Sequence, residues 1–195
     1  HRGACGCEEN TGDGAGILFQ VPHTFLREAC TNLSIKLPAA KEYGVGMFFI
    51  SPNVAERKAC QKTFEDIVRE EGQVFLGWRD VPTNNSTLGP TAKASEPFVC
   101  QAFIGKQASL KDELAFERKL YMIQRRAENA IRFGNVAGGK YFYISSLSCK
   151  TIIYKGMFMS EQVEEFYPDL ANPAVDSALA LVHSRFSYNT FPSWE

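Results

Sequence analysis

The stretch Val45–Ile50, with the sequence VGMFFI, is the longest apolar run in the chain and its strongest structural signal. A continuous apolar run of strand length, rich in aromatic and β-branched residues, predicts a strand that is buried on both faces. The run is far too short to cross a bilayer, which takes about 20 apolar residues. It therefore predicts the central strand of a covered sheet.

Two long helices are predicted after this strand in the sequence. Asn53 is a suitable N-cap for a helix over residues 54–71, and Gly72 ends it. The clearest helix spans residues 110–133, because its apolar residues recur at steps of three and four and charged residues occupy the opposite side. The members of this stripe are Phe116, Leu120, Ile123, Ala127 and Ala130. Both patterns predict helices that pack on a sheet by one face.

The remaining strands and helices do not alternate strictly. Further strands are expected at 73–81, 98–104, 140–147, 151–155 and 178–186, and short helices at 23–32 and 160–167. Ser148-Cys149-Lys150 predicts a hairpin between two of these strands, and the polar segment 82–97 predicts a long loop. This order indicates an α+β domain in which sheets pack together and helices lie outside them.

Composition restricts the class of protein. The chain has 195 residues, of which 45% are hydrophobic, a size and content that suit one globular domain. Twenty-one Lys and Arg balance 22 Asp and Glu without long blocks of one sign, which argues against a nucleic-acid or membrane partner. Cysteines that mostly stand alone indicate reduced thiols and therefore an intracellular protein, which we expect in the cytoplasm or a plastid. The chain opens on His1 and stops at Glu195, so we expect it to be part of a longer polypeptide.

The cysteines predict no disulfide framework and no metal site. Most of them stand alone, which favours reduced and mostly buried thiols: Cys5, Cys7, Cys30, Cys60, Cys100 and Cys149. The Cys5-Gly6-Cys7 stretch lacks the second ligand pair that a structural zinc site needs.

The glycine-rich segment Gly12–Gly16 leads into an apolar strand, not into a helix. A dinucleotide-binding loop requires a helix at that point, so a tight turn is predicted and no nucleotide site.

A dense polar cluster, His183–Trp194, follows the last predicted strand. Arg185 presents a planar fork of donors that matches a carboxylate, although a lone arginine is also a common ion-pair partner. A Ser–His–acid triad through His183 lacks the Gly-x-Ser-x-Gly elbow around any serine. The residues alone therefore leave the role of Arg185 open.

Several segments, taken together and in order, resemble the N-terminal class II glutamine amidotransferase domain of the glutamate synthase family. Each is weakly diagnostic alone, but their joint order is specific and covers nearly the whole chain. They are His1–Ala4, Thr11–Gly16, Tyr43–Phe49, Leu76–Thr83, Phe142–Ser148, Ile153–Met157 and His183–Trp194. The NADH-dependent type is most similar, particularly in Cys5–Glu8.

The resemblance implies an Ntn-hydrolase fold, a four-layer αββα sandwich of two antiparallel sheets, here incomplete at both ends. It implies hydrolysis of L-glutamine to glutamate and ammonia, with the ammonia channelled to the reductive amination of 2-oxoglutarate. The nucleophile of the family is an N-terminal cysteine whose free α-amine serves as base. The full-length enzyme would use FMN, FAD, iron–sulfur clusters and NADH, none of them bound by this chain. Its partners would be the synthase domains of the same polypeptide, and a homo-oligomer or a smaller electron-donor subunit is compatible with it.

The resemblance assigns substrate-binding roles within residues 1–195 but no catalytic residue. The family nucleophile lies upstream of His1 and its oxyanion segment lies downstream of Trp194, so this partial domain is expected to be inactive alone. Arg185 matches the arginine that binds the α-carboxylate of glutamine, and Ser187 and Thr190 are expected to line the pocket. Arg2 and Asp13 are expected to support the backbone there.

One departure keeps a second function open. Tyr188 replaces a threonine of the family pattern in the glutamine pocket, and tyrosine is much bulkier. The alternative is a non-catalytic amidotransferase-like module that serves as a binding or scaffold domain.

Overall fold

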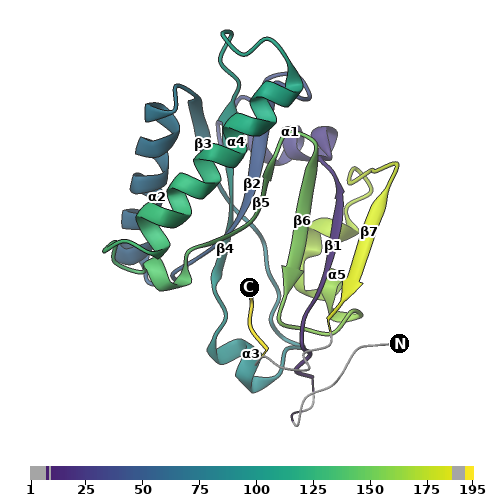
Figure 1. The fold of residues 1–195 in the computed structure, drawn as a ribbon. Coiled ribbons are helices and arrows are strands. Elements are labelled where there is room, and N and C mark those ends of the chain that lie inside the picture. Colours follow the sequence, from purple (N-terminus) through teal and green to yellow (C-terminus); the bar gives the residue numbers. More distant parts are fainter. Residues whose placement is uncertain (1–7, 9, 186–191) are drawn as a thin grey trace.

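The chain forms two antiparallel sheets, with two long helices on the outer face of one of them (Figure 1). The structure is a computed structural model that describes residues 8, 10–185 and 192–195. The strand orders are β3-β4-β2-β5 in one sheet and β6-β1-β7 in the other. The predicted α+β class with two antiparallel sheets is confirmed.

The predicted central strand is β2 (Tyr43–Ile50), and all of its residues are buried. It pairs with β4 (Phe98–Gly105) on one side and with β5 (Tyr143–Ser148) on the other, and β3 (Val74–Asp80) completes this sheet beyond β4. Its side chains alternate between two cores, because successive residues of a strand point to opposite faces. Val45, Met47 and Phe49 join the core between the sheets, whereas Phe48 and Ile50 join the core beneath the helices.

Helices α2 (Val54–Glu70) and α4 (Glu113–Ala127) cover the four-stranded sheet (Figure 1). The predicted cap of α2 is confirmed, since the side chain of Asn53 accepts hydrogen bonds from the backbone N–H groups of Ala55 and Glu56. The caps satisfy donors that have no partner inside a helix, and Asp112 does the same for α4 by accepting from Ala115 at 2.6 Å.

The second long helix differs from its prediction at both ends. It begins at Glu113 rather than near Leu110, and after Ala127 the chain continues as a π-helix over Glu128–Arg132. The wider π turn changes which residue faces the sheet, so Ile131 is buried while Ala130 is exposed. The apolar stripe was therefore right as far as Ala127 and wrong at Ala130.

The three-stranded sheet consists of β6 (Thr151–Gly156), β1 (Ala15–Gln20) and β7 (Ala180–Ser184). The predicted hairpin between residues 140–147 and 151–155 is wrong, because β5 and β6 lie in different sheets. Serine side chains take up the hydrogen bonds that a hairpin would make: Ser145 donates to the Ile153 carbonyl at 3.3 Å and Ser146 accepts from the Ile153 N–H at 3.1 Å. The turn thus passes the chain from one sheet to the other.

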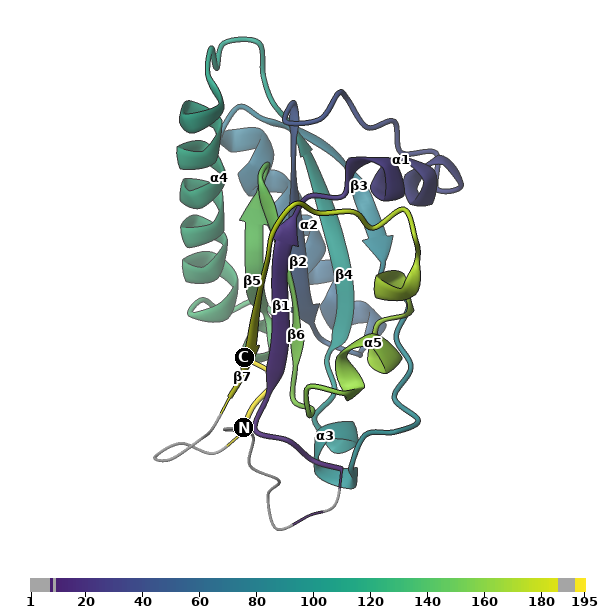
Figure 2. The same ribbon diagram turned by 90° about the vertical axis from the view of Figure 1, so that its right-hand side faces the viewer.

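The shorter helices are α1 (His23–Thr31), α3 (Pro90–Ala94), α5 (Gln162–Phe166) and 3-10 turns at Gly139–Tyr141 and Pro168–Ala171. In Figure 2, α1 lies toward the top of the molecule, α3 lies at the bottom, and α5 lies along one side. Helix α3 corrects the prediction of a plain loop over 82–97. Its Ala92 and the preceding Leu88 are buried in the core between the sheets, so this polar-looking segment is anchored by apolar residues. None of the helices in the described part of the chain has the length and hydropathy that a membrane span requires.

A fully connected polar network lies inside the core between the sheets. The Arg79 guanidinium donates to both carboxylate oxygens of Asp169, at 2.7 and 2.8 Å, and to the side-chain oxygen of Gln101 at 3.0 Å. The Tyr154 hydroxyl donates to Asp169 at 3.0 Å and accepts from Gln101 at 2.9 Å. Because every member has a partner, the network ties β3 and β4 of one sheet to β6 of the other and to the turn at Pro168–Ala171.

Candidate functional site

The end of β7 meets the start of β1 beside the glycine-rich segment Gly12–Gly16. The N–H of Arg185 donates to the carbonyl of Gly14 at 2.7 Å. Gly14 has φ +133°, which side chains disfavour, and a Cβ on Gly12 would come within 2.6 Å of the Phe158 backbone. The predicted close approach of backbone segments is therefore confirmed, but the predicted tight turn over Gly12–Gly16 is only a bend at Asp13, because Ala15 and Gly16 already belong to β1.

A groove of about 380 Å³ opens over this junction. The floor consists of Gly16 and Leu18 of β1 and of Gly14, which precedes that strand. Side chains from β6, β7 and the C-terminal segment form the walls. The polar and charged residues that line it are Asp13, Lys155, His183, Arg185, Ser193 and Glu195. Arg185 is half-buried there and donates to the Glu195 carbonyl at 3.3 Å.

The charges in the groove are mixed. Lys155 and Arg185 are cationic, Asp13 is a buried acid, and the Glu195 carboxylate forms an ion pair with Arg132. A lining that offers both signs suits a small zwitterionic ligand, and the planar fork of Arg185 suits its carboxylate.

The structure places the predicted site residues unevenly. Arg185, Asp13 and His183 line the same groove. Ser187, Tyr188 and Thr190, together with Arg2, Cys5 and Cys7, lie outside the described residues. The role of Arg185 as a carboxylate ligand remains a prediction.

Lys155 is a groove residue that sequence reasoning did not single out. It alternates with buried residues along β6, where Ile152 and Tyr154 point into the core. A lysine in an otherwise apolar and aromatic strand was the sequence feature that could have identified Lys155. The predicted hairpin, however, gave no reason to place this residue near Arg185.

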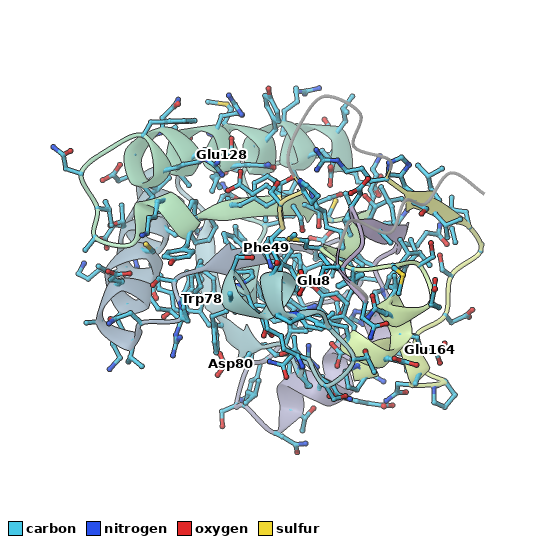
Figure 3. The ribbon with its side chains drawn as sticks, turned by 90° about the horizontal axis from the view of Figure 1, so that it is seen from below. Glu8, Phe49, Trp78, Asp80, Glu128 and Glu164 are labelled. Carbon is cyan, nitrogen blue, oxygen red and sulfur yellow. The ribbon has the colours of Figure 1, made fainter. Side chains whose placement is uncertain are left out.

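A larger cavity of about 740 Å³ lies where the opposite face of β1 and β7 meets α5. Its lining includes the acids Glu161, Glu164 and Asp176 but not Arg185, and Glu164 is labelled on α5 in Figure 3. An acidic lining disfavours a carboxylate ligand, so size alone does not make this cavity the better candidate site.

The described thiols are unsuited to nucleophilic attack. Cys30, Cys60, Cys100 and Cys149 are buried and form no disulfides, which confirms the prediction for these four. Burial raises the pKa of Cys30 and Cys60 to about 11, that of Cys149 to about 12, and that of Cys100 well above its usual value. The thiolate is the nucleophilic form, and it is scarce at neutral pH in such surroundings.

Within residues 8, 10–185 and 192–195, no three His, Cys, Asp or Glu side chains gather closely enough to hold a metal ion.

Comparison with known proteins supports a single family over the whole chain. The family model for class-II glutamine amidotransferases matches residues 1–195. The chain is 52% identical over its full length to the large chain of NADPH glutamate synthase from Bacillus subtilis, of which it covers 12%. It is 40% identical to NADH glutamate synthase from Saccharomyces cerevisiae, covering 9% of that protein, and 36% identical to a ferredoxin-dependent glutamate synthase from Synechocystis, covering 12%.

The chain thus spans about a tenth of the length of these curated relatives. The match of the family model over all 195 residues shows that the chain belongs to the class-II glutamine amidotransferases.

Proposed function

We propose that this chain is part of the glutamine-hydrolysing domain of a glutamate synthase. The observation that carries the proposal is the family match over the whole chain, joined to full-length similarity with several relatives that bear that name. The ammonia released would be used for the reductive amination of 2-oxoglutarate elsewhere in the same polypeptide.

In this proposal Arg185 binds the α-carboxylate of L-glutamine through two parallel hydrogen bonds. Its backbone is fixed to Gly14 at 2.7 Å, so the position of the side chain is set by the junction of two strands rather than by a free loop. Ser187 and Thr190 follow along the chain and would line the same pocket. The half-buried position of Arg185 in the groove supports this assignment.

The proposed nucleophile is a cysteine upstream of His1, with its α-amine as base. Its thiolate would attack the side-chain amide carbon of glutamine, ammonia would leave, and water would then release glutamate from the thioester. The four described thiols offer no substitute, because burial keeps them protonated at neutral pH. The oxyanion-binding segment is likewise proposed to lie downstream of Trp194.

The electron donor is the finer part of the proposal. We propose NADH, with FMN, FAD and iron–sulfur clusters in the synthase domains and an intracellular location. The resemblance in Cys5–Glu8 supports NADH, while relatives named for NADPH and for ferredoxin mark the competing donors. Initial rates of the full-length protein with NADH, NADPH and reduced ferredoxin distinguish the three.

The decisive experiment treats the full-length protein with an electrophilic, cysteine-directed analogue of glutamine. We expect one covalent adduct at a cysteine upstream of His1 and loss of glutamine turnover in proportion to labelling. A folded protein that binds no label and hydrolyses no glutamine would contradict the proposal and favour the non-catalytic scaffold module.

A second test uses the 195-residue chain itself. We expect no glutamine hydrolysis by this polypeptide, because its proposed nucleophile is absent. Ammonia release above that of an Arg185→Ala control would show that a residue within the chain acts as nucleophile.

A further inference from the structure

Three residues form a row across the three-stranded sheet, near the end where β1 begins and where β6 and β7 end. Gly16 of β1 is directly opposite Lys155 of β6 on one side and His183 of β7 on the other. Neighbouring strands lie about 4.8 Å apart, so Lys155 and His183 face the same side of the sheet with backbones about 10 Å apart. Arg185 follows His183 by two residues and therefore projects from this same side.

The space between these side chains exists because β1 has no side chain there. A Cβ on Gly16 would lie 2.7 Å from the Cβ of Lys155, and one on Gly14 would lie 3.7 Å from side-chain atoms of Arg185. The groove floor is thus bare backbone at Gly14 and Gly16, and Lys155 and Arg185 border this part of it from opposite sides of β1.

Lys155 carries a charge that no carboxylate neutralises among the described residues. Its ammonium lies 3.1 Å from the Tyr143 hydroxyl and 4.7 Å from the centre of that ring. The ion pairs in the described part of the chain engage other lysines, and the nearby Glu195 carboxylate is held by Arg132. A cation held by an aromatic ring at a groove wall remains able to bind an anionic group of a ligand.

We propose that Lys155 is a second carboxylate-binding residue of this groove and that it binds the side-chain carboxylate of L-glutamate. The inference rests on the proposed function, in which Arg185 holds the α-carboxylate. Glutamine and glutamate have the same length and differ at the side-chain end, where glutamine has a neutral amide and glutamate an anion. Lys155 therefore strengthens binding of the product more than binding of the substrate, and L-glutamate acts as a competitive inhibitor against glutamine.

The test is competitive inhibition by L-glutamate of glutamine consumption in the full-length enzyme under turnover conditions. Competition against glutamine separates this groove from any glutamate site elsewhere in the protein. The variants are Lys155→Met, which removes the cation, and Lys155→Arg, which keeps it. Lys140→Met is the matched control, because Lys140 makes the same kind of contact with Tyr141, at 4.9 Å, but does not line the groove.

We expect Lys155→Met to raise the inhibition constant of L-glutamate about tenfold, because one charge-assisted hydrogen bond is lost at a partly exposed site. The same variant should change the KM for glutamine by less than about twofold. Lys155→Arg and Lys140→Met should keep both constants close to those of the parent enzyme.

Two results would overturn the assignment while leaving the proposed function intact. One is an unchanged inhibition constant in an active Lys155→Met enzyme, and the other is an equal weakening of glutamine and glutamate. If Lys155→Met does not fold, Lys155→Arg still decides, because an active arginine variant with a lost preference for glutamate would contradict a charge-based role. A parent enzyme that consumes no glutamine would instead refute the proposed function.

Discussion

Replacing Asp169 by alanine should destabilise the chain by about 3–5 kcal/mol, because the variant leaves the Arg79 guanidinium charged and buried without its partner. The side chains of Arg79 and Asp169 are only 7% and 5% exposed, so solvent cannot take over the lost hydrogen bonds. Three hydrogen bonds disappear with the carboxylate, two from Arg79 and one from Tyr154. The cost is a large part of the 5–15 kcal/mol that typically separates folded from unfolded domains.

Two further variants separate the buried charge from simple loss of packing. Asp169→Asn keeps the shape of the side chain and one acceptor, so its effect should lie between those of the parent chain and Asp169→Ala. The double variant Arg79→Met with Asp169→Leu removes both charges together, and its stability should return to within about 1–2 kcal/mol of the parent chain. Asp66→Asn breaks exposed ion pairs with Lys62 and Arg69 and should leave the unfolding midpoint unchanged.

Urea denaturation at neutral pH, followed by circular dichroism, measures these differences. In a thermal melt, the Tm of Asp169→Ala should be lower than that of the parent chain by on the order of 10 °C, for a domain of this size. An alanine variant within about 1 kcal/mol of the parent would refute the argument, since it would mean that water reaches the guanidinium or that the pair is not formed. A double variant as unstable as the single one would show that packing, not charge, sets the effect.

Three other predictions concern the groove, the pH dependence and the thiols. In the full-length enzyme, Arg185→Lys should raise the KM for glutamine about tenfold and keep kcat within about threefold of the parent, because a point charge replaces a planar fork of donors. Steady-state kinetics measure both constants, and an unchanged KM would argue against the role of Arg185 as a carboxylate ligand. Hydrogen bonds from Lys119 and Arg126 hold the pKa of Glu71 below its usual value of 4.5. The stabilisation from the Glu71 carboxylate is therefore present above pH 4.5 and is lost as the pH falls through and below that value. Glu71→Gln should be less stable than the parent chain at neutral pH and should lose less stability on acidification, which urea titrations across the acid range would show. Four thiols are buried: Cys30, Cys60, Cys100 and Cys149. Iodoacetamide at neutral pH should leave them unmodified in the folded chain and alkylate them after unfolding, as measured by mass spectrometry. Labelling of these four thiols in the folded chain would contradict their burial.

Local signals in the sequence predicted most elements of this fold. Val45–Ile50 lies within a strand buried on both faces, and Asn53 caps the helix that follows. These features depend on neighbours in the chain, which a periodic pattern describes well. The hairpin at Ser148–Lys150 failed because the choice of pairing partner is non-local: β5 pairs with β2 and β6 pairs with β1.

The groove was only partly predictable for the same reason. Arg185 was recognisable from its chemistry and from the resemblance of its segment to a family. Lys155 could not be placed beside it, since the two residues are brought together by the registers of two different strand pairs across β1. The buried pair Arg79 and Asp169 was missed as well, because charge in a sequence usually marks solvent-exposed positions.

The chain contains two tryptophans, and the fold assigns one to each core. Trp78 packs on Phe48 and Phe64 beneath the helices and donates to Glu65 at 3.0 Å, whereas Trp194 packs on Phe49, Phe158 and Phe166 between the sheets. In Figure 3 Trp78 lies toward α2 and Phe49 lies near the middle of the molecule. The chain therefore carries two tryptophan fluorophores in separate surroundings, and Trp78→Phe and Trp194→Phe would each leave a single tryptophan. Emission from either one reports, without an added dye, whether the two halves of the sandwich melt as one unit or in sequence.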